Sequence, residues 1–407
     1  MTDADPSIAN LSAASDTGAS NSGNDAAAAG SASLAAGEQS PAELAEARRY
    51  GHLQLLAGLA DKLLDVVFLA VMAFWVARPA GAYLATVNPH PSAQLWLLFL
   101  LTTGVHLALS FPLSYYGGYW LEHRFGLSHL TFAGWLWRYT KVQLLSTFFG
   151  GLLLWGLYGV IWTTGGWWWL VAAGLFFLVS VVAGQLVPVI IMPLFYKIQK
   201  IENPELLDRM ARLAAGTGLT IAGVYRFDLS ADTAKANAML AGLGRTRRVL
   251  MGDTLLANFT PDEIEVIFAH EIGHHVFRHI RKMIAGGAVY TAVGFLLVNW
   301  LVMAWVRAAD PAADYAHFPI DTLPLVMLVL TLFSLLLEPL QNAISRRFER
   351  QSDRYALERT GRREAYISAF QKLARLNKDD PAPHWLEVFW FHSHPPIAER
   401  LAVAEKG

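Results

Sequence analysis

The sequence predicts a mainly α-helical fold: a multi-pass membrane helical bundle of about six spans, joined to a polar domain with a small β-hairpin or sheet. Two observations lead to this fold. Hydrophobic residues make up 54% of the 407 residues and charged residues only 16%, against roughly 25% charged in soluble domains. Several apolar segments also reach the length of about 20 residues that a bilayer span needs. Continuous segments of this kind, apolar on all sides, favour a membrane protein over a large soluble core.

Six segments are candidates for the spans. Five of them are long and apolar, whereas the first is short and has Asp65 near its start. Pro188 and Pro193 are expected to kink or end the fourth. In chain order the segments are 63–77, 95–116, 142–163, 167–195, 284–306 and 323–340. They predict a four-span membrane region over 45–195 and two further spans within 284–341.

Basic residues alternate between the two sides of the predicted bundle. Lys and Arg precede the first span, separate the second from the third and the fourth from the fifth, and follow the sixth. The connections 79–93 and 164–166 carry none, and the exceptions, Arg78 and Arg307, are single. By the positive-inside rule, both polar segments, 196–283 and 342–407, then lie on the cytoplasmic side of an integral membrane protein. In a bacterium this would be the inner membrane.

The composition also limits the structure of the amino-terminal tail, the partners of the protein and the residues that could bind a metal. Residues 1–44 are rich in Ala, Ser and Gly without an apolar run, which predicts a disordered tail. The formal net charge of −1 gives no whole-chain attraction for nucleic acid, and we expect no such partner. Because the chain has no cysteine, disulfides, thiolate metal sites and cysteine catalysis are excluded. Any metal must be held by His, Asp or Glu.

The polar segment 196–283 is expected to combine helices and strands. A helix is predicted over 204–217, a strand over 223–227, and a hairpin from 236–243 and 248–251 around Gly242-Leu243-Gly244-Arg245. A further helix begins near Thr260, with Pro261 in its first turn and acidic residues at its positive end. We expect this helix to run through PDEIEVIFAHEIGHHVFRHI.

That helix contains a metal-binding motif. His270 and His274 are four residues apart, so both imidazoles project from one face and can share a metal ion. Glu271 points to the side, where it can contact a metal-bound water as a general base. The other histidines nearby, His275 and His279, lie off the ligand face and are expected to support a ligand or lie on the surface. The pattern predicts the zincin-like metallopeptidase site of one zinc ion per chain.

A catalytic zinc usually takes three protein ligands, so a third must come from elsewhere in the chain. Glu349 and Asp353, just past the sixth span, are four residues apart and form one acidic stripe on a helix. Spacing alone leaves two interpretations open. Glu349 is either a ligand, or both acids belong to a solvated helix and pair with Arg346 and Arg350.

Further short motifs occur in a fixed order around this one. They are Lys235-Ala236-Asn237-Ala238, Gly252-Asp253-Thr254-Leu255-Leu256, His270 to His274, Ser345-Arg346-Arg347-Phe348-Glu349 with Asp353, and Ser393-His394-Pro395-Pro396 with Arg400. Over roughly residues 45 to 405 the chain resembles the integral-membrane zinc metallopeptidases known as type I CAAX prenyl proteases. Eukaryotic members of that family have seven spans, one more than we count.

The resemblance implies roles for individual residues. Glu349 would be the third zinc ligand and Asp353 an acidic helper beside it. Asn237 and Ala238, with their strand, would face the substrate. His394 and Arg400 would help to stabilise the reaction centre.

The expected activity is zinc-dependent hydrolysis of peptide bonds. Because a span begins at 284, soon after His274, the metal should lie near the membrane face, within reach of a lipid-modified carboxy-terminal peptide. Only the resemblance indicates that the substrate is prenylated. Two alternatives stay open: a quality-control metalloprotease acting on unmodified proteins, and a metal-binding membrane transporter or scaffold without hydrolytic activity. Glu271 argues against the second, because metal storage needs ligands but no base.

Overall fold

The structure, a computed structural model, describes residues 39–242 and 247–406. Residues Gln39–Gly407 form one compact unit. Most of the predicted tail, 1–44, lies outside the described residues, but its last part does not behave as predicted. Helix α2 begins at Pro41, because Ser40 and Glu43 form a capping box that satisfies the free N–H groups of the first turn. The tail boundary at 44 is therefore wrong by a few residues.

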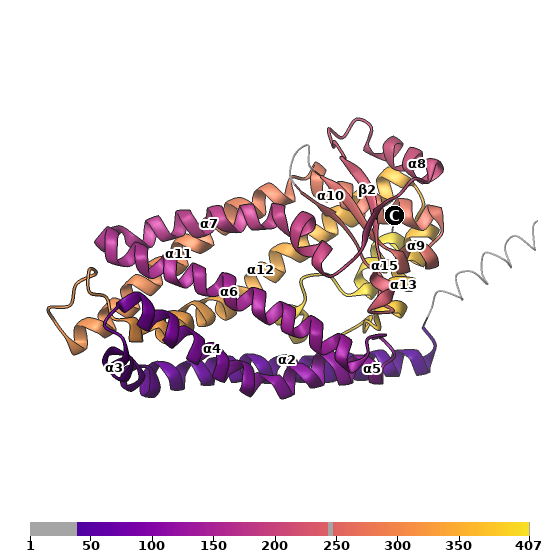
Figure 1. The fold of residues 1–407 in the computed structure, drawn as a ribbon. Coiled ribbons are helices and arrows are strands. Elements are labelled where there is room, and N and C mark those ends of the chain that lie inside the picture. The colour runs from indigo at the N-terminus through magenta and orange to yellow at the C-terminus, as the bar shows by residue number, and fades with distance from the viewer. Residues whose placement is uncertain (1–38, 243–246, 407) are drawn as a thin grey trace, which may run out of the picture. The chain divides into compact units, whose positions relative to one another are not determined.

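Long helices form the first half of the described chain (Figure 1). Helix α2 continues through a π-helical turn, η1, into the short helix α3. Helix α7 ends at Leu186, just before Pro188, in agreement with the kink or end predicted from the prolines. The bounds are α2 (Pro41–Val71), η1 (Met72–Val76), α3 (Ala77–Val87), α4 (Pro91–Tyr115), η2 (Tyr116–Trp120), α5 (Leu121–Arg124), α6 (Phe132–Thr164), η3 (Gly165–Trp167), α7 (Trp168–Leu186), η4 (Val187–Ile191) and η5 (Met192–Leu194).

Four continuous helical stretches of the described residues are long and apolar enough to cross a membrane: 91–124, 132–194, 279–309 and 320–360. The second stretch joins two predicted spans through the turn η3, so five of the six predicted segments, apart from residue 195, fall within these four. The segment 63–77 lies in α2, η1 and the first residue of α3 and is not among these four stretches. Its crossing of the membrane stays a prediction.

A four-stranded sheet follows the first helices, in the order β1-β2-β4-β3. The strands are β1 (Ile198–Lys200), β2 (Gly223–Phe227), β3 (Ala238–Ala241) and β4 (Arg248–Gly252). Strand β2 has the predicted bounds, and β3 and β4 pair antiparallel as the predicted hairpin requires. Part of the predicted turn, 243–246, lies outside the described residues. The parallel pairing of β2 with β4 places β3 at an edge of the sheet.

The remaining helices of the described residues lie between and after the strands in the chain. They are η6 (Leu229–Ala231), α8 (Pro204–Ala214), α9 (Asp253–Asn258), α10 (Pro261–Val276), α11 (His279–Ala309), η8 (Ile320–Thr322), α12 (Leu323–Thr360), α13 (Arg363–Asn377), α14 (Trp385–Phe391) and α15 (Ile397–Lys406). Helix α8 ends before the predicted residue 217, because the chain turns through Gly216 and Gly218, both with positive φ.

The predicted helix over 261–280 is two helices. Helix α10 ends at Val276, and Arg278 adopts a left-handed conformation with φ of 58° before α11 begins at His279. No glycine or proline marks this break, so the sequence pattern alone does not reveal it. Because of this break, the motif helix α10 does not have to continue in the direction of α11, which contains the predicted span.

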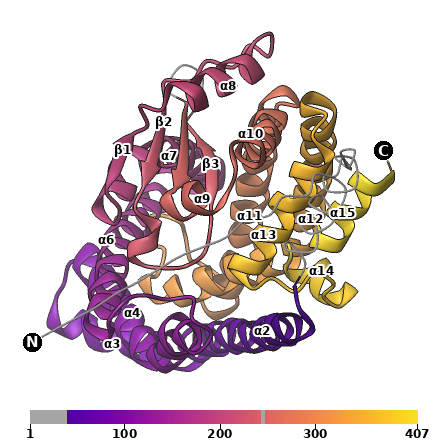
Figure 2. The same cartoon turned by 90° about the vertical axis from the view of Figure 1, so that its right-hand side faces the viewer.

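Close packing of α10 on α12 positions the candidate site (Figure 2). Gly273 allows this approach, because a Cβ atom there would lie 2.9 Å from the Cα atom of Ser352. Phe268 and Ile272 of α10 are fully buried in a core that also includes Ala356 of α12 and Ala369 of α13. The two helices are thus held in one fixed register.

Candidate metal centre

The motif helix α10 is fixed at its amino end. Its Thr260 hydroxyl caps the helix by accepting a hydrogen bond from the N–H of Glu263, and the Glu263 carboxylate accepts one from the N–H of Thr260 at 2.7 Å. Glu263 is buried and also accepts bonds from the Ser368 hydroxyl and from Nζ of Lys372. Burial alone would raise the pKa of Glu263, but these donors outweigh it and lower the pKa. The helix start is therefore anchored to α13.

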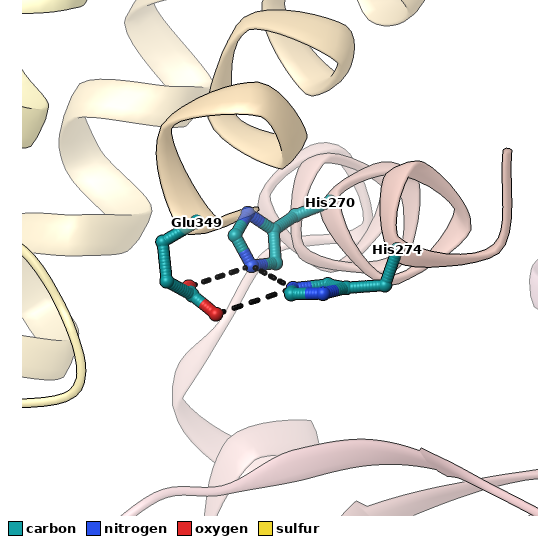
Figure 3. Close-up of side chains that lie close together, drawn as sticks. All are labelled: His270, His274 and Glu349. Carbon is teal, nitrogen blue, oxygen red and sulfur yellow. Dashed lines mark hydrogen bonds and ion pairs between the residues drawn. The ribbon is translucent and has the colours of Figure 1, made fainter. Parts of the chain in front are cut away.

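Three side chains converge between α10 and α12 (Figure 3). The Nε2 atoms of His270 and His274 lie 3.2 Å apart. The carboxylate of Glu349 lies across from them, with Oε2 at 3.2 Å from Nε2 of His270 and Oε1 at 3.3 Å from Nε2 of His274. The structure thus brings together the two predicted ligands and the proposed third one, although Glu349 follows the motif by more than seventy positions in the chain.

Hydrogen bonds orient the ring of His270. Its Nδ1 lies 2.9 Å from Oδ1 of Asp353, a buried carboxylate that can only accept, so Nδ1–H donates and Nε2 faces Glu349. Arg400 in turn holds Asp353 through two bonds, Nε to Oδ2 at 3.0 Å and Nη2 to Oδ1 at 2.6 Å. The guanidinium of Arg400 also lies 3.9 Å from the ring centroid of Phe370.

A second chain of hydrogen bonds orients His274. The side-chain oxygen Oε1 of Gln351 accepts a hydrogen bond from Nε2–H of His279 at 2.9 Å. This bond leaves Nδ1 of His279 as an acceptor. That atom lies 3.1 Å from Nδ1 of His274, so Nδ1–H of His274 donates and its Nε2 is free to face the centre. His279 is fully buried, and the predicted supporting role fits it.

The residues at this centre fit a metal ion. Two imidazole nitrogens and a carboxylate face one another, and the buried Oε2 of Glu349 accepts no hydrogen bond from the described residues. Acceptors arranged in this way need a cation between them. In the absence of a metal a proton takes that place: burial lowers the pKa of His270, but Asp353 and Glu349 outweigh it and raise the pKa to about 9. A set of two His and one carboxylate is typical of catalytic zinc sites.

A cavity of about 700 Å³ opens beside the metal centre. Of the other predicted site residues, Asn237, Ala238, Glu271, His394 and Arg400 all line it, together with His270 and Glu349. Oε2 of Glu271 accepts a hydrogen bond from the backbone N–H of Leu240 in β3 at 3.3 Å. Asp353 does not line the cavity but lies behind His270.

His394 lies close to the carboxylate of Glu349. Its Nε2 lies 3.7 Å from Oε1 of Glu349, and 62% of its side chain is exposed. His394 can therefore reach a molecule in the cavity. Arg400 is 8% exposed and is bound mainly to Asp353.

Sequence reasoning missed two residues that shape the centre. Gly273 lies inside the motif, but its contact with Ser352 depends on a helix far away in the sequence. Gln351 has no pattern that links it to His279.

Two family patterns match the chain. Peptidase family M48 matches residues 200–406, and the pattern described as CAAX prenyl protease N-terminal, five membrane helices, matches residues 31–197. The second pattern contains one membrane helix more than the four we predict for 45–195. The short helix α3, between α2 and α4, lies in the same range.

Individual relatives cover most of the chain. CAAX prenyl protease 1 of Saccharomyces cerevisiae is 30% identical over 359 residues, which is 83% of this chain and 77% of the yeast protein. A Bacillus subtilis protein named Uncharacterized metalloprotease YhfN is 29% identical over 389 residues, 90% of this chain and 86% of that protein. The crystal structure of S. mikatae Ste24p has the same fold, with a TM-score of 0.77, 26% identity and 90% of each chain covered.

Proposed function

Because the chain belongs to peptidase family M48 and to the CAAX prenyl proteases within it, we propose that it cleaves peptide bonds at a zinc ion held by His270, His274 and Glu349. The protein is a membrane zinc metalloendopeptidase. The observation that carries the proposal is the convergence of three ligand atoms from α10 and α12. Membership of a peptidase family also removes the transporter or scaffold alternative.

Zinc held there would act as a Lewis acid that activates water and polarises the peptide carbonyl. The protein residues then determine orientation. Asp353 and the pair formed by His279 and Gln351 direct the Nε2 lone pairs of both imidazoles inward. We propose that Arg400 holds Asp353 in place, since its guanidinium donates two hydrogen bonds to that carboxylate.

Glu271 is proposed as the general base. Its carboxylate would accept the proton of the attacking water and then donate it to the leaving amine nitrogen. Two observations support this role: Glu271 lines the same cavity as His270, and its side chain projects toward β3 rather than joining the three ligands. The hydrogen bond from Leu240 holds the carboxylate at that edge of the cavity.

We propose that the substrate binds along β3. This strand is at the edge of the sheet, so its outward backbone groups, apart from the N–H of Leu240 that donates to Glu271, are available to pair with an extended peptide. Asn237 and Ala238 line the cavity at the start of the strand. As the peptide oxygen gains negative charge, the exposed His394 would donate a hydrogen bond to it.

We further propose that the substrate is modified with a lipid. The cavity extends from the metal ligands to Gly58 and Lys62 of α2 and to Glu338 of α12, where Nζ of Lys62 pairs with Glu338 at 2.8 Å. Apolar residues such as Leu55, Leu59 and Phe391 line it along the way. A peptide that carries a prenyl group near its carboxyl terminus could then place the apolar tail against these membrane-side helices.

The topology stays a proposal as well. The basic residues around the predicted spans favour a cytoplasmic metal centre. We retain the division into a membrane region at 45–195, a motif region at 196–283, further spans within 284–341 and a ligand-bearing region at 342–407. Five spans before residue 197 would change the side on which the amino terminus lies, without moving the metal centre.

Cleavage of matched peptides, with and without a prenylated cysteine, tests the proposal. Detergent-purified protein should cut the prenylated peptide faster, and Glu271→Ala or a chelator should abolish cleavage. Equal rates for both peptides would remove the prenyl preference and favour a protease of unmodified proteins. Absence of any metal-dependent cleavage would contradict the proposed centre.

A further inference from the structure

A second cavity lies at the other end of the motif helix. It has a volume of about 460 Å³ and surrounds the break between α10 and α11. It shares no lining residue with the cavity beside Glu271, but His274 of the metal centre forms part of its wall. Its lining includes four arginines, Arg247, Arg278, Arg281 and Arg359, and contains no Asp or Glu. The cavity is therefore strongly positive.

Arg247 is the least expected of these cations, because it is buried. Its side chain precedes β4 and is only 9% exposed. Nη1 contacts Nδ1 of His275, whereas Nε has no hydrogen-bond partner among the described residues. A guanidinium carries five N–H donors, and a buried charge without a counter-ion is costly. Burial and the nearby charge of Arg281 together lower the pKa of Arg247, in line with an uncompensated cation.

The neighbouring arginines add charge without neutralising it. Arg278 and Arg281 are exposed at the start of α11, and the ion pairs of the described residues include none for either of them or for Arg247. The left-handed conformation of Arg278 is rare for a residue with a side chain and fixes the turn that brings it to the cavity. Arg359 differs, since Nη2 donates to the carbonyls of Leu213 and Ala215 and so builds the wall.

The location of this cavity limits the kinds of ligand that it can bind. The apolar part of α11 begins with Met283, two residues after Arg281. In the proposed topology the cavity therefore opens at the level of lipid headgroups. Guanidinium groups bind phosphate oxygens with paired hydrogen bonds, and several of them around one pocket favour a phosphate over a carboxylate of single charge.

We propose that Arg247, Arg278 and Arg281 form a binding site for a phosphate-bearing anion, on the side of His274 that faces away from the cavity beside Glu271. The ligand is either the headgroup of an anionic phospholipid or a soluble phosphate compound, since both present the same oxygens. The site goes beyond the proposed peptidase activity and does not depend on it.

Binding to the full-length, detergent-purified protein tests the proposal in two arms. In the first, the protein is reconstituted in nanodiscs of phosphatidylcholine with or without phosphatidylglycerol, and retained lipid is measured by native mass spectrometry. In the second, inorganic phosphate and glycerol 3-phosphate are titrated in nonionic detergent at constant ionic strength, with the thermal unfolding temperature as readout. The variants are Arg247→Gln and Arg281→Gln. Lys282→Gln is the matched control, because it removes one charge from the same segment but does not line the cavity.

We expect each arginine variant to weaken binding roughly tenfold or more, as the loss of a charge-assisted hydrogen bond does, and the control to change it little. Retention of phosphatidylglycerol alone identifies a lipid headgroup, and stabilisation by the soluble compounds identifies a free phosphate. Equal weakening by Lys282→Gln would indicate general attraction to a basic surface and overturn the proposal. Binding that neither arginine variant changes would also overturn it. The exposed Arg281 keeps the test valid if Arg247→Gln does not fold.

Discussion

Nδ1 of His270 lies 2.9 Å from Oδ1 of Asp353, which is 83 residues further along the chain. This hydrogen bond sets which nitrogen of His270 faces Glu349, because the carboxylate can only accept. The predicted acidic stripe of Glu349 and Asp353 is thus divided, because Glu349 lies at Nε2 of His270 and Asp353 lies at Nδ1 on the other side of the ring.

Replacement of Asp353 tests that arrangement. Asp353→Asn should lower the zinc affinity by roughly 10- to 100-fold, because loss of such an outer partner weakens the ligand it orients. Competition with a chelator of known affinity measures the change. Glu358→Gln, an exposed position on the same helix, is the control and should bind zinc as the unmodified protein does. Unchanged affinity in Asp353→Asn would remove the orienting role.

Glu271→Gln should keep zinc and lose activity. The amide has nearly the same shape but cannot accept a proton, so kcat should fall by roughly 10² to 10⁴. Metal content by mass spectrometry and cleavage of the preferred peptide measure the two properties on the same sample. A variant that retains both zinc and full activity would contradict the assigned base.

Gly273→Ala should separate the two halves of the metal centre. The added Cβ atom would meet the Cα atom of Ser352 at 2.9 Å, so α10 and α12 must move apart. Overpacking of this kind typically costs about 1–3 kcal/mol, and we expect a lower unfolding temperature together with weaker zinc binding. Gly286→Ala on α11, where a Cβ atom meets nothing within 4 Å, provides the control. Normal zinc affinity in Gly273→Ala would show that the close contact is not needed.

Zinc binding to the metal-free protein should weaken as the pH falls below about 9. The pKa of His270 is raised to about 9, so below that value a proton occupies the nitrogen that the metal needs. One competing proton weakens the apparent affinity by up to roughly tenfold per pH unit. Chelator competition at several pH values on either side of 9 checks this slope. An affinity independent of pH over that range would contradict the role of His270.

Glu263 should stabilise the fold only while it is ionised. Its pKa in the folded protein is lowered from the ordinary value of 4.5, so its contribution is present above 4.5 and is lost as the pH falls through the lower, folded value. Glu263→Gln should therefore reduce the free energy of unfolding at neutral pH by about 1–3 kcal/mol, which a lower unfolding temperature would show. In acid, the unfolding temperatures of the variant and the unmodified protein should differ little. Glu364→Gln, exposed on α13, should have no such effect at either pH.

Local patterns in the sequence were sufficient for several of the elements. The bounds of β2, the antiparallel pairing of β3 with β4 and the start of α10 follow from alternation, turn residues and a helix cap, all of which act within a few residues. The imidazole pair follows from helical spacing alone. The break at Arg278 did not, because a strained conformation is maintained by packing around it rather than by its own side chain.

The sequence by itself determined that His270 and His274 lie on one face of a helix, because that relationship depends only on helical periodicity. It could not decide between a ligand and a solvated ion pair for Glu349. Only the tertiary structure shows that the Glu349 carboxylate lies beside both imidazoles, since the packing of α10 on α12 through Gly273 and Ser352 brings these side chains together. Contacts between residues distant in sequence depend on how whole helices fit together, which no local pattern records.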